Sequence, residues 1–213
     1  METDKLKSLI PGEVEIEINP THSARISIKV AHDIDKVGLQ RAASAMLRSF
    51  GLNGGRENFK DTPKRIMQMW SDWLAPQTLD LPVFTTPSTS SGMVLLRNHS
   101  AVTVCPHHLL PVEVTVDVGY LPQNHVVGIS KLPRFVNAVC GSFMLQEHIS
   151  EFIAQTLDCL LQPKGVVCRV RGTHGCMHLR GVRSTGDILT TTCTGVFLTD
   201  DKARNEFVQS VER

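Results

Sequence analysis

The first half of the chain carries apolar positions at helical spacing. Residues 33–50 follow this period and Gly51 ends the run, which predicts a helix. A second helix is expected over residues 61–73, because Asp61 stands at the capping position and Pro63 falls in the first turn. The two helices predict a small helical lobe near the N-terminus.

The segments on either side of this lobe have weaker patterns. Residues 14–18 and 24–30 alternate around a turn at Asn19-Pro20-Thr21, which is typical of a hairpin or of a loosely held arm. Residues 76–92 are rich in Pro, Thr, Ser and Gly, so we expect a linker there. The expected organisation is an N-terminal arm (1–32), a helical lobe with its linker (33–92) and a larger domain (93–213).

In the larger domain the pattern changes from strands to helices and back to strands. Residues 112–121 alternate with their valines on one face, whereas residues 145–161 form a strong amphipathic stripe that stops at Pro163. We expect strands at 93–96, 112–121, 166–173 and 188–198, and helices at 131–139 and 145–161. This order predicts an α+β fold, an antiparallel β-sheet with two helices on one face.

Composition narrows the class of protein. The 213 residues are 41% hydrophobic and 20% charged, which is an ordinary globular balance. Lys and Arg number 22 against 21 Asp and Glu, so no overall field favours nucleic acid or an anionic membrane. Neither a run of about 18 apolar residues nor a signal-peptide pattern is present, and we expect a cytoplasmic protein without a membrane partner.

Two clusters of Cys and His could carry chemistry. The six cysteines are too sparse for a disulfide scaffold, which leaves metal binding or core packing. In Cys105-Pro106-His107-His108, the first and last side chains can converge on one metal from a tight turn. In His174-Gly175-Cys176-Met177-His178, His174 and Cys176 point to the same side if the backbone stays extended.

Two sulfurs and one imidazole without an obvious fourth ligand predict an open zinc site. An open position leaves room for water, whose pKa zinc lowers to about 7, and His107 or His174 could then move protons. A closed structural site with His178 or Cys193 as fourth ligand is the alternative. Taken singly, such residues are more often buried thiols or surface histidines.

Basic side chains near these clusters could bind phosphate. They are Lys131, Arg134, Arg180 and Arg183, and the alternative is an ordinary solvated face. Arg169 and Arg171 have the opposite parity to Cys176 and are expected to point away.

Together these blocks resemble GTP cyclohydrolase I over about residues 33–210. The matching segments are CPHHLLP at 105–111, VGISKLPR at 127–134, LQE at 145–147, HGCMHLRGV at 174–182, RNEF at 204–207 and DTPKR at 61–65. The resemblance implies a tunnelling (T) fold behind the helical lobe, assembled as a toroidal homodecamer with active sites between subunits. It also implies hydrolysis of GTP at C8 of the purine, release of formate and closure to 7,8-dihydroneopterin triphosphate, a first step of tetrahydrobiopterin or tetrahydrofolate biosynthesis. It assigns no regulatory protein partner.

The same resemblance implies roles for individual residues. His107 would be the acid that protonates the imidazole ring of the purine, positioned by Gln146, with His174 as a second proton carrier. Zinc (Zn2+) would be held by Cys105, His108 and Cys176 and would activate the water that attacks C8.

For the substrate, the resemblance implies that the Glu147 carboxylate accepts hydrogen bonds from the guanine edge. An unpaired buried carboxylate would penalise the wrong base. The triphosphate and ribose contacts would be Arg65, Ser130, Lys131, Arg134 and Arg180.

Three positions depart from the family pattern. Pro106 stands where Glu is usual, Cys140-Gly141-Ser142 where an Arg pair is common, and His148 where Arg usually follows Gln-Glu. The departures remove charges but no implied zinc ligand. They leave open a catalytically weakened member that binds GTP or regulates, and a purely structural zinc protein is a third hypothesis.

Overall fold

The structure is a computed structural model that describes residues 14–19, 23–28, 34–52, 57–75, 77–86 and 92–212. Its largest sheet has four antiparallel strands in the order β4-β5-β7-β8. The strands are β4 (Val94–Val104), β5 (Pro111–Leu121), β7 (Gly165–His174) and β8 (Ile188–Cys193). The alternation of valine with polar residues in β5 buries Val114, Val116 and Val118 on one face, as the sequence predicts.

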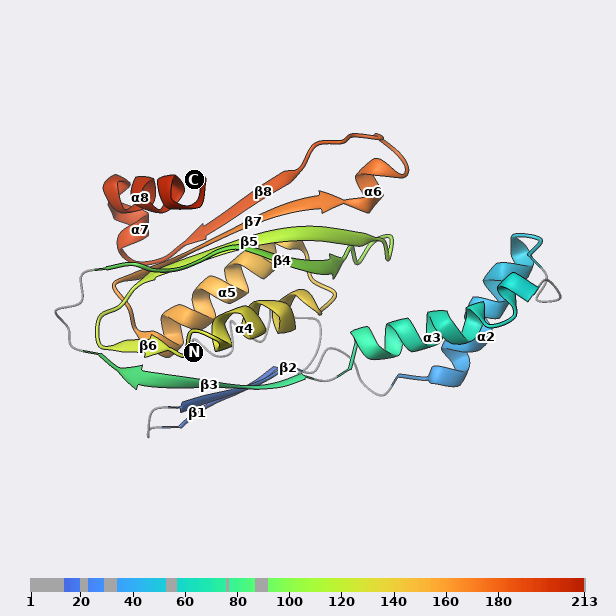
Figure 1. Cartoon of the computed structure of the whole chain (residues 1–213), viewed down its shortest axis with the longest axis horizontal. Helices are drawn as coiled ribbons and strands as arrows, with labels where there is room; N and C mark the ends of the chain where they lie inside the picture. Colours follow the sequence, from blue (N-terminus) through green and yellow to red (C-terminus); the bar gives the residue numbers. More distant parts are fainter. Residues whose placement is uncertain are drawn as a thin grey trace.

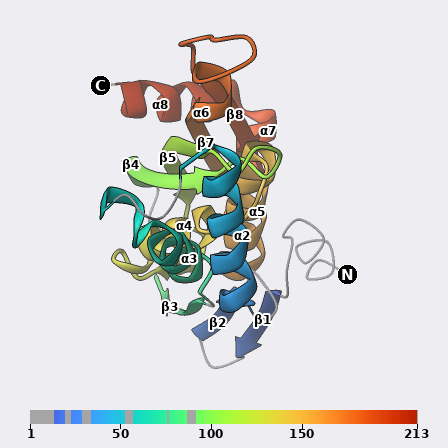
Figure 2. The same ribbon diagram turned by 90° about the vertical axis from the view of Figure 1, so that its right-hand side faces the viewer.

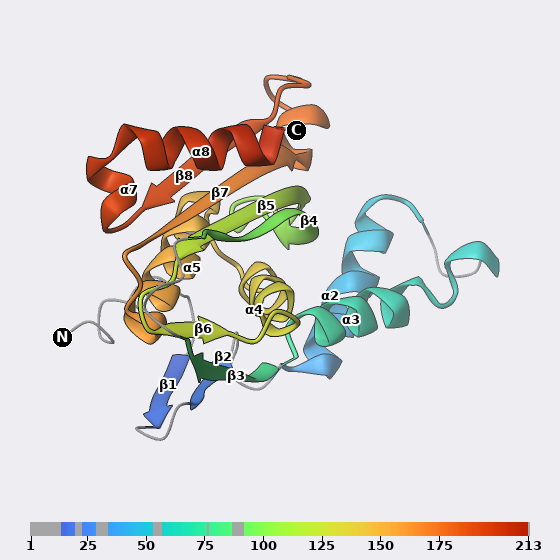
Figure 3. The same cartoon turned by 60° about the vertical axis from the view of Figure 1, so that its left-hand side comes forward.

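Two helices pack against that face. They are α4 (Lys131–Cys140) and α5 (Gln146–Leu161), and their apolar sides join the sheet in one core, where the rings of Phe135 and Phe152 lie 6.2 Å apart. A second sheet lies on the far side of these helices (Figures 1 and 3), with the order β1-β2-β3-β6. Its strands are β1 (Val14–Asn19), β2 (Ser23–Ile28), β3 (Gln77–Thr85) and β6 (His125–Val127). The helices are therefore enclosed between two sheets.

The second sheet corrects the expected linker over residues 76–92. Residues 77–85 form β3, which pairs with both β2 and β6. The physical reason is the alternation of Leu79, Leu81 and Val83, which are all buried. The N-terminal alternation is confirmed as a hairpin, because β1 pairs with β2 from Val14↔Ile28 to Asn19↔Ser23.

The opposite face of the large sheet is covered at one end by C-terminal helices. The strand expected over 188–198 ends at Cys193, and α7 (Val196–Thr199) and α8 (Asp201–Glu212) follow. Phe197, Phe207 and Val211 form a second core with Val167 of β7. Gly119 lets Phe207 approach the strand closely, since a Cβ at position 119 would lie 3.0 Å from that ring.

The helical lobe stands beside this body (Figures 1 and 2). It contains α2 (Lys36–Ser49) and α3 (Thr62–Trp73), with a short 3-10 helix at Glu57–Phe59 between them, so both predicted helices are confirmed. Asp61 precedes α3, but its side chain makes no capping hydrogen bond. Trp70 of α3 contacts Phe143 of the α4–α5 connection, with ring centroids 5.8 Å apart. None of the helices in the described ranges is long and apolar enough to cross a membrane.

A buried ion pair links the strands beneath α8. Arg169 Nε donates to Asp117 Oδ2 at 3.2 Å, and both side chains are almost fully buried. The other Asp117 oxygen accepts from the Asn98 backbone N–H at 2.7 Å, at an irregularity in β4. Arg169 and Asp117 thus lie on the face that does not carry α4 and α5.

We expect Asp117→Ala to lower the free energy of unfolding by about 3–5 kcal/mol, because it removes the buried counter-ion of Arg169. The guanidinium would keep only the largely exposed carboxylate of Glu212, at 3.5 Å. Urea unfolding measures this loss. Asp187→Ala is the matched control, since Asp187 pairs with Arg171 at 3.5 Å where both side chains are about half exposed. That control should cost less than about 1 kcal/mol, and equal losses in the two variants would contradict the prediction.

Candidate metal centre and its histidines

The connection between β4 and β5 is a tight turn that brings Cys105 and His108 together. The backbone N–H of Leu109 donates to the Cys105 carbonyl at 2.8 Å, and the Cys105 N–H donates to the Leu110 carbonyl at 2.9 Å. Leu109 takes a left-handed conformation with φ of 52° to close the turn. The Cys105 sulfur consequently lies 3.7 Å from Nδ1 of His108.

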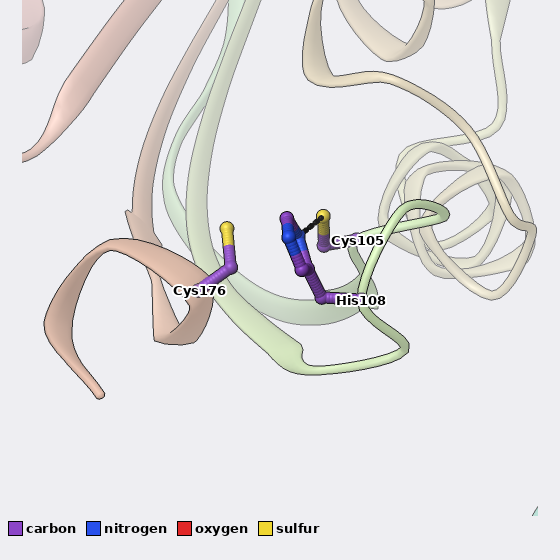
Figure 4. A group of neighbouring side chains, drawn as sticks. All are labelled: Cys105, His108 and Cys176. Atoms are coloured by element: carbon purple, nitrogen blue, oxygen red, sulfur yellow. Dashed lines mark hydrogen bonds between the residues drawn. The ribbon is translucent and has the colours of Figure 1, made fainter. Parts of the chain in front are cut away.

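Cys176 approaches this turn from the end of β7. The strand ends at His174 and the backbone enters a one-turn helix, α6 (Gly175–His178). The parity argument from an extended backbone was therefore wrong for Cys176, although its sulfur still points toward the other two side chains (Figure 4). The possible ligand atoms of Cys105, His108 and Cys176 all lie within 4.8 Å of one another.

The donor set fits zinc. Two sulfurs and one imidazole suit this ion better than magnesium or calcium, which prefer oxygen ligands. Among the described residues, neither His178 nor Cys193 belongs to the group. Cys105 is buried whereas His108 is exposed, so one side of the group faces solvent.

The two sulfurs influence each other. Burial raises the pKa of the Cys176 thiol, and the neighbouring Cys105 raises it further through a hydrogen bond and through charge. The positive charge of Arg180 acts in the opposite direction and lowers the pKa of Cys176. A cation between the sulfurs would favour both thiolates in the same way.

Gln146 holds the second histidine of the site in one orientation. Its Nε2 donates to the carbonyls of Val170 and Ile188 at 3.0 and 2.9 Å. Because carbonyls only accept, these bonds fix the amide, and Gln146 Oε1 accepts from Nε2 of His174 at 2.8 Å. The neutral His174 ring therefore carries its proton on Nε2 and presents the lone pair of Nδ1.

Burial lowers the pKa of His174, and the nearby His178 lowers it further, whereas the Glu147 carboxylate raises it. The neutral ring is therefore favoured near pH 7, and Glu147 lies close enough to influence it. Gln146, Glu147 and His174 form one group where the first turn of α5 meets the sheet.

Gly172 makes this arrangement possible. It lies in β7 beneath the Gln146 side chain, and a Cβ at this position would clash with Gln146 Oε1 and come within 3.2 Å of His174 Nε2. Gly172 was not among the residues expected from the sequence, although an isolated glycine within a strand pattern often marks such a close approach. Nor was Thr190, whose hydroxyl lies 3.4 Å from Gln146 Nε2.

His107 lies beside the metal centre, with its ring centroid 6.3 Å from that of His108, and it is exposed. The resemblance led us to expect that Gln146 positions His107. The structure instead pairs Gln146 with His174. The reason is that α5 directs Gln146 onto β7 and β8, where three partners hold its amide.

The proposed phosphate-binding residues do not all meet within one chain. Arg180 donates from Nη1 to Nε2 of His108 and so belongs to the metal centre. Ser130, Lys131 and Arg134 lie at the start of α4, near β6, which is the opposite end of the body from α6 (Figure 1). Arg65 is an exposed residue of α3, in the lobe.

Comparison with known proteins identifies the family. The family model for GTP cyclohydrolase I matches residues 39–212. A protein named GTP cyclohydrolase 1 from Aquifex aeolicus is 36% identical over 180 residues, covering 84% of this chain and 98% of its own length. Its namesake from Sulfurihydrogenibium is 35% identical, covering 84% and 96%. The chain belongs to the GTP cyclohydrolase I family.

A more distant similarity was found among solved structures. The apo form of the archaeosine synthase QueF-Like is 19% identical, with a TM-score of 0.41. The matched region covers 52% of this chain and 96% of the QueF-Like chain.

We expect Gly172→Ala to displace the Gln146 amide and release His174, because the added methyl group would clash with Oε1. Carbethoxylation followed by peptide mass spectrometry should then show a severalfold faster modification of His174. His107, which is already exposed, should react at its wild-type rate. Gly92→Ala is the control, since a Cβ there meets nothing within 4 Å. An unchanged rate at His174 in Gly172→Ala would show that the glycine is not needed for this contact.

Proposed function

We propose that this chain hydrolyses GTP at C8 of the purine with zinc as cofactor, releases formate and yields 7,8-dihydroneopterin triphosphate. The observation that carries the proposal is the open group of two sulfurs and one imidazole beside a histidine whose tautomer is fixed. Membership of the GTP cyclohydrolase I family supports the choice of substrate. This pterin product would serve tetrahydrobiopterin or tetrahydrofolate biosynthesis, and the protein would act in the cytoplasm.

Cys105, His108 and Cys176 would hold the zinc ion. When bound, zinc supplies a water molecule made nucleophilic near neutral pH. His174 presents Nδ1 as a base, with Nε2 occupied by Gln146. His107 is exposed on the same turn as His108 and can therefore approach a bound purine to donate a proton to its five-membered ring.

Glu147 would select guanine. It is exposed in the first turn of α5, next to Gln146 and near His174. A carboxylate there can accept two hydrogen bonds from the N–H groups on the guanine edge, which adenine cannot offer in the same pattern. Loss of these bonds for the wrong base would leave the carboxylate without its partners.

The proposal requires a second copy of the chain. Arg65, Ser130, Lys131 and Arg134 would bind the triphosphate and ribose together with Arg180, yet the start of α4 lies far from α6 within one chain (Figure 1). A neighbouring subunit that places its α4 beside α6 would complete the pocket. We therefore propose a tunnelling fold assembled as a homodecamer with sites between subunits.

A GTP-binding or regulatory member without efficient turnover is the second candidate. Ser142 is fully buried, with its hydroxyl donating to the Val139 carbonyl at 2.6 Å. Burial raises the pKa of the Cys140 thiol, two residues earlier, to about 12. This segment therefore offers no charge where the family commonly has an Arg pair, and Pro106 and His148 remove two more.

Metal-replete protein incubated with GTP should release formate and give a fluorescent pterin after oxidation. Elemental analysis should find about one zinc per chain. Cys105→Ala and Cys176→Ala should each lose the metal and the turnover, whereas the control Cys193→Ala should keep both. Nucleotide binding without product would favour the second candidate, and full activity in a protein stripped of metal would contradict the first.

His107→Ala should abolish turnover while leaving zinc content near that of the wild type, because His107 donates a proton and does not hold the metal. His99→Ala is the matched control, since His99 lies on β4 and bonds to Asn137 at 2.8 Å. Formate release and zinc content are measured in both variants. Retained turnover in His107→Ala would remove this residue from the mechanism.

A further inference from the structure

Arg180 occupies a position that bears on the metal centre itself. Its Nη1 donates a hydrogen bond to Nε2 of His108. The residue lies two positions after the end of α6, in a turn where the Arg183 N–H donates to the Arg180 carbonyl at 3.3 Å and Gly181 has φ of 59°. Its charge also acts on Cys176. Arg180 therefore contacts or influences two of the three possible metal ligands.

This hydrogen bond restricts the imidazole of His108. A guanidinium group has N–H donors and no acceptor, so Nε2 must offer its lone pair and the ring proton must be on Nδ1. A neutral imidazole that binds a metal uses the lone pair of one nitrogen and carries its proton on the other. If Nδ1 binds the metal, the proton moves to Nε2. If Nε2 binds the metal, its lone pair is already used.

Both choices exclude the bond from Arg180. We propose that Arg180 and the metal ion compete for His108, and that metal binding releases the Arg180 guanidinium to bind a phosphate group of the substrate. This inference rests on the proposed function for the identity of metal and substrate. Because coupling between two ligands is reciprocal, phosphate bound at Arg180 should in turn favour metal binding at His108.

The first test measures zinc affinity by competition with a chromogenic chelator. Arg180→Gln should bind zinc roughly tenfold more tightly than the wild type, because a charge-assisted hydrogen bond no longer has to be broken. The glutamine amide can accept from His108 as well as donate to it, so it favours neither ring tautomer. Arg180→Lys keeps the charge and the donors, and its affinity should stay close to that of the wild type.

Arg183→Gln is the matched control for charge. Arg183 lies three positions further along the same exposed loop, and its replacement removes the same unit of charge. Its zinc affinity should stay within about twofold of the wild type. An unchanged affinity in Arg180→Gln would overturn the competition. An equal gain in both glutamine variants would also overturn it, because the effect would then be general electrostatics.

A second measurement uses the unaltered protein and does not depend on the folding of any variant. An arginine-selective dicarbonyl reagent is applied to zinc-free and zinc-loaded samples, and the modified peptides are quantified by mass spectrometry. Modification of Arg180 should become severalfold faster when zinc is bound, while Arg183 should not change. Equal rates at Arg180 in the two samples would contradict its release.

These readouts can fail independently of the proposed function. Formate release from GTP without a change at Arg180 would retain the hydrolase and discard the competition. Conversely, zinc-dependent release of Arg180 in a protein that makes no product would retain the competition and discard the hydrolase.

Discussion

The register between β5 and β7 is the constraint on which the site depends. Val112 of β5 pairs with His174 at the end of β7. The preceding residue of β5, Pro111, pairs with Val104 of β4 and closes the turn between those two strands. These pairings place the turn that carries Cys105 and His108 beside the end of β7, where α6 presents Cys176. A slip of one residue would turn the valines of β5 away from the core, so the buried face fixes the position of the metal ligands.

The elements with a strong hydrophobic period and the three candidate metal ligands could be predicted from the sequence. The valine alternation of β5 and the apolar stripe of α5 predicted a sheet packed against helices. The spacing of Cys105 and His108 predicted a turn that could bind a metal. Cys176 was chosen on a wrong local conformation, because residues after His174 form a helical turn, and yet the choice of ligand agrees with the group of three.

The remaining features depend on contacts between distant segments. Leu79, Leu81 and Val83 are buried in the core that they share with α4 and α5, and β2 and β6 pair with their strand on either side. The proline and threonine residues nearby made this segment look like a linker in the sequence. The contact of Gln146 with His174 depends on how α5 crosses β7 at Gly172. The bond from Arg180 to His108 depends on how the loop after α6 folds back. No local pattern encodes these distances.

X-ray absorption at the zinc edge of the loaded protein identifies the atoms bound to the metal. We expect two sulfurs at about 2.3 Å and one imidazole nitrogen at about 2.0 Å, with one further light atom from an exchangeable ligand. A coordination shell without sulfur, or one filled by four protein ligands, would contradict this expectation.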